Sequence, residues 1–321
     1  MKEPLILTID FGTQSVRAGL FNKKGEIVAL EKAKYEPAYF SKNPGWAEQD
    51  PDYYFECLCK ATNALVKKNK DKIQDVLGIT MAFFRDSVVC VGKNGKPVRP
   101  AILWLDERRA EGKYKLPKLN RLIFKLVGMG PTVELNMKRS MAQWIRENEP
   151  ETFKKIKYVL QIEDFIVYKL TGIRQIDYSL ATRTMGFDIK NLCWSEEIFA
   201  AADISTDLFS TPVPSGTVAG PITEEVSKKT GLTQETVIVS ISQDQIAAAV
   251  GAGVFSSDVA VDGAGTVQCM TPVYDEIPDM RVMTKGKYAV VPYVIPGKYV
   301  CYAFSYTGGA LMQWCTSTLA K

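Results

Sequence analysis

The residues best suited to chemistry follow the first predicted strand of this chain, in the stretch DFGTQS at residues 10–15. A glycine lets the backbone approach an anion without a Cβ in the way, and hydroxyl, amide and backbone N–H groups can bind phosphate oxygens. The residues that offer these groups are Gly12, Thr13, Gln14 and Ser15. Asp10 can reach a magnesium ion through water, because Mg²⁺ keeps several waters and takes few carboxylates. The stretch predicts half of a nucleotide phosphate clamp, although most Gly-Thr turns belong to plain hairpins.

A second stretch, DGAGTVQ at residues 262–268, repeats this order of an acidic residue, glycine and threonine between two predicted strands. Gly265 and Thr266 would be its phosphate-binding residues. Two such turns at the start of successive α/β units favour a polyphosphate held between them over two unrelated hairpins. We therefore expect a nucleotide site built from both halves of the chain.

Acid–base chemistry in this chain must fall on carboxylates, because the sequence contains no histidine. Asp244 stands at the carboxyl end of the predicted buried strand ETVIVSIS and directly before the alanine-rich segment DQIAAAVGAG. In open α/β sheets, ligands bind in the crevice beyond such strand ends. Taken alone, Asp244 fits an N-cap of the following helix equally well.

Composition excludes several other classes of protein. The 321 residues are 46% hydrophobic, and 40 basic residues nearly balance 36 acidic ones, which indicates a globular protein with no nucleic-acid partner. No apolar stretch is long enough to span a bilayer, and no signal peptide is evident. The seven cysteines form no Cys-x-x-Cys pair and indicate reduced thiols. We expect a cytoplasmic protein without a zinc site.

The pattern of elements predicts a sheet with helices added to it. Alternating runs at 5–10, 15–22 and 26–35 indicate an antiparallel meander, and Asp50-Pro51 begins a helix. Further strands are expected over 75–83, 87–92, 157–162 and 235–242. Asp164 is the expected cap of a helix that stops at Gly172, and residues 205–221 are expected to be irregular.

The chain resembles the FGGY family of carbohydrate kinases, within the wider actin-like ATPase superfamily. The resemblance covers essentially all of the chain and rests on the order and spacing of several stretches: DFGTQSVRAGLF, GWAEQDP at 45–51, GKPVRPAILWLDERR at 95–109, LTG at 170–172, SQDQIAAAVGAG at 242–253 and GAGT at 263–266. The resemblance implies ATP-dependent phosphorylation of a sugar or polyol hydroxyl, with Mg²⁺, in a cleft between two domains.

The implied fold is α/β, with a duplicated ribonuclease-H-like domain in which helices flank a mixed sheet. The expected domains are an N-terminal, sugar-binding domain over residues 1–253 and the start of a C-terminal, nucleotide-binding domain over 254–321. Family members run well beyond this length, so the second copy is expected to be incomplete. Gly308 and Gly309 would start a helix near the nucleotide.

The resemblance also assigns roles to individual residues. Asp244 matches the catalytic base and Gln245 a substrate-contacting position. The resemblance places Arg85 and Asp86 where glycerol-kinase-type members hold polyol hydroxyls. Two more residues match the Trp-x-Asp wall of the sugar site, namely Trp104 and Asp106. Without the resemblance, Arg85 and Asp86 would be read as a surface ion pair and the tryptophan as core.

Three matters stay open at this point. The acceptor can be a ketopentose such as xylulose, gluconate, or a polyol such as glycerol, because the motifs point in different directions. A non-catalytic sugar-binding fragment and an actin-like nucleotide switch remain alternatives to a kinase. A homodimer is also possible.

Overall fold

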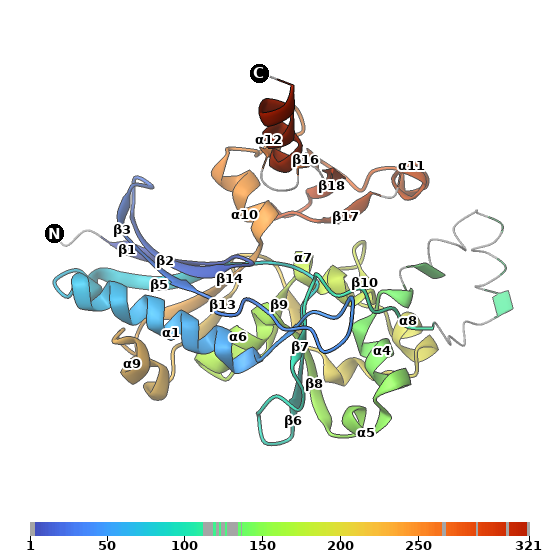
Figure 1. Ribbon diagram of the computed structural model, residues 1–321, viewed down its shortest axis with the longest axis horizontal. Helices are drawn as coiled ribbons and strands as arrows, with labels where there is room; N and C mark the ends of the chain where they lie inside the picture. The colour runs from blue at the N-terminus through green and yellow to red at the C-terminus, as the bar shows by residue number, and fades with distance from the viewer. Residues whose placement is uncertain are drawn as a thin grey trace. The chain divides into compact units, whose positions relative to one another are not determined.

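The computed structural model describes residues 4–111, 118–119, 122, 126, 134–135, 137–264, 268–286, 288–305 and 308–319. The chain divides into two compact units, Met1–Asp244 and Gln245–Lys321, which Figure 1 colours from blue to yellow-orange and from orange to red. The sequence analysis places the domain boundary after residue 253, so the two boundaries differ by the helix α10 Asp244–Gly251.

The first unit contains a mixed sheet with the order β13-β14-β5-β1-β2-β3. Its strands are β1 Leu5–Phe11, β2 Ser15–Asn22, β3 Ile27–Lys34, β5 Val76–Phe83, β13 Val218–Pro221 and β14 Val237–Gln243. The first three form the predicted antiparallel meander. Strands β14, β5 and β1 are parallel neighbours, so their carboxyl ends meet at one edge of the sheet.

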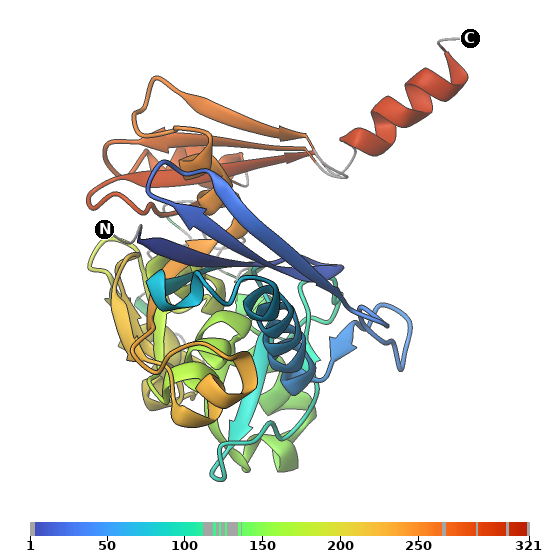
Figure 2. The ribbon, with the colours of Figure 1, turned by 90° about the vertical axis from the view of Figure 1, so that its left-hand side faces the viewer.

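Helix α1 Pro51–Lys68 covers this sheet together with α6 Ile162–Thr171 and α9 Glu224–Thr230 (Figures 1 and 2). The Asp50 side chain caps α1 as predicted, accepting a hydrogen bond from the Asp52 N–H, and proline occupies the first turn. Alternate residues of β1 are buried beneath the helices. The resulting core includes Leu7, Ile9, Leu20, Tyr54, Leu58, Phe165 and Ile166.

A second sheet in the first unit has the order β4-β7-β6-β8. Its strands are β4 Glu48–Gln49, β6 Val88–Gly92, β7 Ala101–Ile102 and β8 Ile156–Gln161. The first unit also contains shorter elements: the helices α4 Met141–Asn148, α5 Pro150–Phe153, α7 Tyr178–Ala181 and α8 Glu196–Ala201, the 3₁₀ helices η1 Ile73–Asp75, η2 Thr182–Thr184 and η3 Thr206–Leu208, and the strands β9 Gln175–Asp177, β10 Phe187–Asp188 and β11 Cys193–Trp194.

Two sequence-based expectations for local structure are wrong. Helix α6 has Gln161 as its N-cap, and Asp164 lies one turn inside, where its carboxylate accepts a hydrogen bond from the Gln161 N–H at 2.6 Å. The helix does end at Gly172, whose φ of 80° is the left-handed conformation that glycine favours. An acidic residue at the third helical position completes a capping box, so the sequence signal was real but displaced.

The segment expected to be irregular over 205–221 contains two strands. Strand β12 Thr211–Val213 pairs in parallel with β9, and β13 pairs antiparallel with β14. Proline and glycine are compatible with such short edge strands, because an edge strand leaves some backbone groups unpaired. Composition alone therefore underestimated the order of this segment.

The second unit contains a four-stranded sheet with the order β15-β16-β18-β17. Its elements are β15 Ala260–Ala264, β16 Gln268–Tyr274, α11 Met280–Lys285, β17 Ala289–Pro292, β18 Tyr299–Ser305 and α12 Gly309–Thr318. A small core includes Ile246, Val254, Val273, Val291 and Val300. On α12, the side chains of Leu311, Met312 and Trp314 are exposed.

Candidate active site

Three predicted site segments leave one edge of the main sheet side by side. Phe11 at the end of β1 is paired in register with Phe83 of β5, and Phe83 is paired with Gln243 of β14. The Phe11 and Phe83 rings stack, with centroids 4.7 Å apart. The turn after β1, the residues after β5 and Asp244 after β14 therefore begin at the same level of the sheet.

The turn between β1 and β2 has the compact backbone expected of it. The Gly12 N–H donates to the Ser15 carbonyl at 3.0 Å, and the Tyr35 N–H donates to the Gln14 carbonyl at 3.0 Å. The Ser15 hydroxyl is buried and has no hydrogen-bond partner, which is a costly state for a polar group. Thr13 lines a small cavity whose wall also includes Trp104, so the turn adjoins the predicted sugar wall.

Asp10 faces Arg17 across the β1–β2 hairpin. The two residues are directly opposite in register, and the Arg17 Nη1 donates to an Asp10 carboxylate oxygen at 2.5 Å. Both side chains remain partly exposed. The carboxylate is thus available at the edge of the sheet, with its charge partly offset by a neighbouring guanidinium.

Arg85 and Asp86 follow β5 directly, as the sequence predicts. Asp86 has a φ of 57°, the left-handed conformation that aspartate tolerates better than most residues. Burial acts to raise its pKa, but the guanidinium groups of Arg183 and Arg85 outweigh burial and hold the pKa of Asp86 below its ordinary value. The side chain of Asp86 is still 31% exposed, so this carboxylate is accessible.

Trp104 and Asp106 have different surroundings although they are two residues apart. The Trp104 side chain is exposed, with 42% of the residue accessible. Its backbone N–H donates to the Ser87 hydroxyl at 3.2 Å, which holds the residue beside the Arg85–Asp86 segment. The side chain of Asp106 is 1% exposed. As placed, Asp106 would reach a substrate only if its own hydrogen bonds broke.

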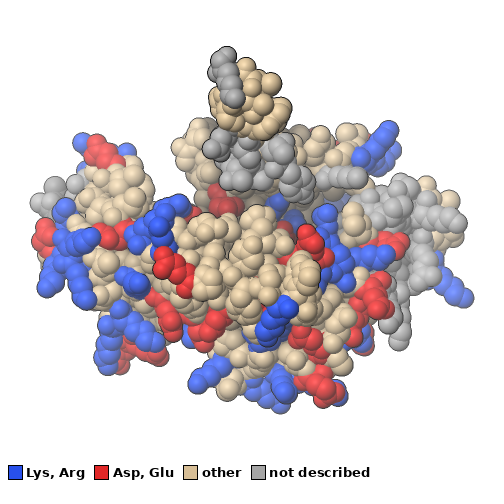
Figure 3. All heavy atoms as spheres, in the orientation of Figure 1, with Lys and Arg blue, Asp and Glu red and all other residues tan. Residues whose placement is uncertain are grey.

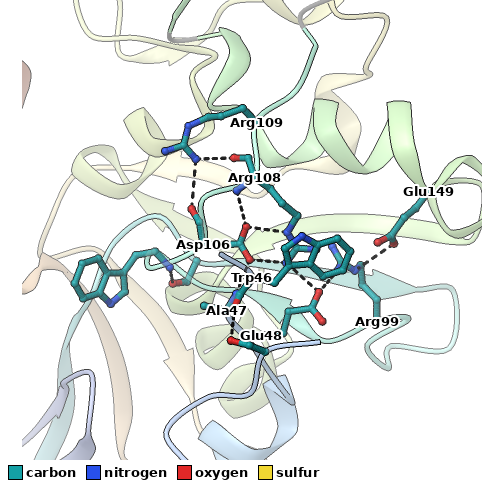
Figure 4. Close-up of polar contacts among 11 residues, drawn as sticks. Trp46, Ala47, Glu48, Arg99, Asp106, Arg108, Arg109 and Glu149 are labelled. Carbon is teal, nitrogen blue, oxygen red and sulfur yellow. Dashed lines mark hydrogen bonds and ion pairs between the residues drawn. The ribbon is translucent and has the colours of Figure 1, made fainter. Parts of the chain in front are cut away.

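Those hydrogen bonds belong to a buried cluster that joins the GWAEQDP and PAILWLDERR motifs (Figure 4). One Asp106 oxygen accepts from the Ala47 N–H at 2.7 Å and from the Arg108 Nη2 at 2.6 Å. The Arg108 Nη2 also donates to Glu48 at 3.0 Å, and its guanidinium lies 3.9 Å from the centroid of the Trp46 ring. These contacts hold the GWAEQDP and PAILWLDERR segments together.

Asp244 is the first residue of α10 and comes after a bulged strand. The β14–β5 register shifts between Ser240 and Ser242, and a bulge of this kind redirects the chain that follows. The Gln243 N–H donates to the Ser179 hydroxyl at 3.4 Å. The side chains of Ser240, Ser242 and Gln243 are buried, so they point into the protein.

Near this strand lies a group of buried acids, of which the sequence analysis named only Asp164, as a helix cap. Burial raises the pKa of Asp164 to about 7 and that of Asp177 to about 6. Burial, aided by the charges of Asp177 and Asp164, also raises the pKa of Glu163 well above its ordinary value. Asp177 nevertheless accepts hydrogen bonds from the Ser179 and Leu180 N–H groups at 3.0 Å and caps α7.

The remaining predicted residues belong to the second unit. Gln245 follows Asp244 in α10, and its side chain lies near Gly263 of β15. Gly308 is the N-cap of α12 and Gly309 its first residue, which agrees with the helix start expected there. Gly265 and Thr266 lie outside the described residues.

Sequence reasoning missed Arg17, Ser87 and Arg183. Arg17 could have been found, because a turn at residues 12–15 places position 17 opposite position 10. Arg183 gave no signal: it lies 97 positions from Asp86, outside every recognised motif.

The charge pattern and metal-ligand content of the chain are unremarkable elsewhere. On the face drawn in Figure 3, basic and acidic side chains are interspersed over the first unit. Within the part of the chain that the structure describes, no group of three or more His, Cys, Asp or Glu residues could hold a metal ion. No helix there is long and apolar enough to cross a membrane.

Known sugar kinases align with almost the whole of this chain. The chain is 28% identical over 319 residues to a xylulose kinase of Lactococcus lactis, with 98% of this chain and 62% of the relative aligned. A gluconokinase of Bacillus licheniformis is 27% identical over 331 residues, covering 98% of this chain and 60% of the relative. The chain thus spans less than two thirds of the relatives' length.

A solved structure of xylulose kinase from Lactobacillus acidophilus has the same fold, with a TM-score of 0.81 and 21% identity over 98% of this chain and 63% of that protein. The α/β architecture expected from the sequence, a mixed sheet flanked by helices, is therefore confirmed. The family model for the "FGGY family of carbohydrate kinases, N-terminal domain" matches residues 5–251. The chain belongs to the FGGY family of carbohydrate kinases.

Proposed function

We propose that this chain acts in the ATP-dependent phosphorylation of a sugar or polyol hydroxyl, with Asp244 as the general base. The observation that carries the proposal is the shared level at which β1, β5 and β14 end. One edge of one sheet offers a phosphate-binding turn, a charged pair suited to hydroxyl groups and a carboxylate. Phosphoryl transfer to an alcohol requires these three functions.

Arg85, Asp86 and Trp104 would bind the acceptor. A guanidinium donates hydrogen bonds to hydroxyl oxygens, and an ionised carboxylate accepts them from hydroxyl protons. The exposed indole of Trp104 can cover the apolar face of a carbon chain. Gln245 would add an amide contact, whereas Asp106 would support the wall through Arg108 and Ala47.

Asp244 would accept the proton of the attacking hydroxyl. That oxygen forms a bond to the γ-phosphorus as the bond from phosphorus to the β–γ bridging oxygen breaks, and ADP leaves. ATP would supply the phosphoryl group, with Mg²⁺ offsetting the charge of its phosphates. A carboxylate at this position needs only to lie within hydrogen-bond reach of the hydroxyl.

The residues at the first turn fit a bound phosphate. The Ser15 hydroxyl is buried and has no hydrogen-bond partner among the described residues, so it would bind a phosphate oxygen only if the turn shifted to expose it. Gly12, Thr13 and Gln14 would add backbone and side-chain donors, and Asp10 would hold Mg²⁺ through water. In the second unit, Gly265, Thr266, Gly308 and Gly309 would contact the nucleotide.

The acceptor proposed is a ketopentose such as xylulose or a polyol such as glycerol. Relatives named as xylulose kinase and gluconokinase support a multiply hydroxylated acceptor. The Arg85–Asp86 pair supports one that presents several hydroxyls to a charged clamp.

The test is acceptor-dependent ADP release with xylulose, xylitol, glycerol and gluconate, measured on the chain. Asp244→Asn should abolish release, because an amide cannot accept the proton. Glu235→Gln is the matched control, since Glu235 is an exposed acid just before β14. Release that is independent of acceptor would favour a nucleotide switch, and binding of an acceptor without any release would favour a non-catalytic sugar-binding protein.

A further inference from the structure

Arg183 makes a two-point contact with the predicted acceptor-binding carboxylate. Its Nε donates to the Asp86 Oδ1 at 2.8 Å, and its Nη2 donates to the Asp86 Oδ2 at 3.3 Å. The Arg183 side chain is 10% exposed. Paired bonds between the planar guanidinium and carboxylate groups hold both in one orientation.

The segment that carries Arg183 is itself firmly held. It follows α7, whose N-terminus is capped by Asp177 through the backbone N–H groups of Ser179 and Leu180. Leu180 and Ala181 are buried in the main core. Arg183 therefore extends from a well-supported turn, and its guanidinium has little freedom to leave Asp86.

Asp86 retains the capacity to bind a ligand in this arrangement. The two oxygens of a carboxylate offer about four acceptor positions, and Arg183 uses one on each oxygen. The Arg85 Nε lies 3.5 Å from Oδ2, and the Asp86 side chain is partly exposed. A position on Oδ1, which accepts only from the Arg183 Nε among the contacts described, thus remains for a hydroxyl donor.

We propose that Arg183 is a positioning residue that orients the Asp86 carboxylate to accept a hydrogen bond from a hydroxyl of the phosphoryl acceptor. The inference rests on the proposed function, because it assumes that Asp86 contacts the acceptor. The competing role is a purely structural one, in which the ion pair only ties η2 to the end of β5.

Calorimetric titration of xylulose, xylitol, glycerol and gluconate into the full chain separates these roles. Arg183→Ala should weaken binding by about tenfold, because Asp86 loses its fixed orientation. Arg183→Lys should recover part of the loss, since an ammonium keeps the charge without the planar fork. The control is Arg281→Ala, which removes an exposed partner of Asp279 in the second unit and should leave binding unchanged.

The pH dependence of acceptor affinity distinguishes the two roles, because a purely structural ion pair would leave it unchanged. The charged groups that face Asp86 are Arg183, Arg85 and Arg139, and together they keep the pKa of its carboxyl low. Wild-type affinity should therefore persist as the pH falls below the ordinary carboxyl range. In Arg183→Gln the pKa of Asp86 rises, so affinity should be lost at a higher pH.

The outcomes separate failure of this inference from failure of the proposed function. An acceptor that binds wild type and Arg183→Ala equally well, with the same pH profile, overturns the role of Arg183 and leaves the kinase proposal standing. A wild-type chain that binds none of the four acceptors overturns both. If Arg183→Ala does not fold, Arg183→Gln takes its place, because it keeps a polar side chain without the planar, charged guanidinium, and it should likewise weaken acceptor binding.

Discussion

Two arginine–carboxylate groups in the first unit have similar chemistry and different surroundings. Asp106 and Arg108 are enclosed, with Glu48 and Trp46 completing their contacts. Asp86 and Arg183 lie at the open edge of the main sheet, where the carboxylate keeps partial exposure. The comparison teaches that enclosure separates a structural ion pair from one that can recognise a ligand, because only the open carboxylate keeps a position for an outside donor.

Removal of the enclosed arginine tests the structural role of the Asp106–Arg108 pair. Arg108→Ala should lower the free energy of unfolding by about 3–5 kcal/mol, because it leaves the buried carboxylates of Asp106 and Glu48 without their shared partner. Chemical denaturation measures the change, and Arg108→Lys should recover part of it. A loss no larger than that of an exposed pair such as Lys68–Glu31 would contradict the structural role.

A buried acid that lacks such a close guanidinium partner should behave differently again, because burial then raises its pKa. Asp164 is bonded by the Ser210 hydroxyl at 2.6 Å and the Gln161 N–H, and burial raises its pKa from 3.8 to about 7. A raised folded-state pKa means that its stabilisation is complete below pH 3.8 and is lost as the pH rises through about 7.

The free energy of unfolding should therefore fall with rising pH in this window, by up to about 1.4 kcal/mol per pH unit from this one group. Denaturant titrations across the window measure the slope. Asp164→Asn should flatten it, whereas the exposed control Asp207→Asn should not. An unchanged slope in Asp164→Asn would show that Asp164 titrates normally.

Two of the tryptophans beside these groups should differ in which property their removal changes. Trp104 is exposed next to the open pair, and Trp144 is buried 4.6 Å from the Arg108 guanidinium. Trp104→Ala should weaken acceptor binding by about threefold to tenfold with little change in stability. Trp144→Ala should instead destabilise the fold by about 3–5 kcal/mol. Equal losses of stability in the two variants would contradict the assignment of Trp104 to the wall of the acceptor site and of Trp144 to the core.

Much of the fold and the position of the site could be predicted from the sequence. The meander, the α1 start at Asp50 and the strand before Asp244 follow from local periodicity and capping. Residues that follow parallel strands meet at one edge, so the turn at 12–15, Arg85 and Asp244 could be placed there before any contact was known.

The surroundings of each site residue could not be predicted in the same way. Trp104 and Asp106 look alike as motif residues, yet one is exposed and the other is enclosed by Ala47 and Arg108. Arg183 reaches Asp86 across 97 positions of sequence. Enclosure and long-range pairing depend on tertiary packing, which leaves no periodic signal in the chain.

Acceptor-dependent ADP release, compared between wild type and Asp244→Asn, is the decisive measurement for the proposed role of Asp244. The account predicts release with at least one sugar or polyol, and a loss of about 100-fold or more in the Asn variant, which is the contribution expected of a general base. Equal release in the two proteins would contradict the role of Asp244 and, with it, the proposed active site.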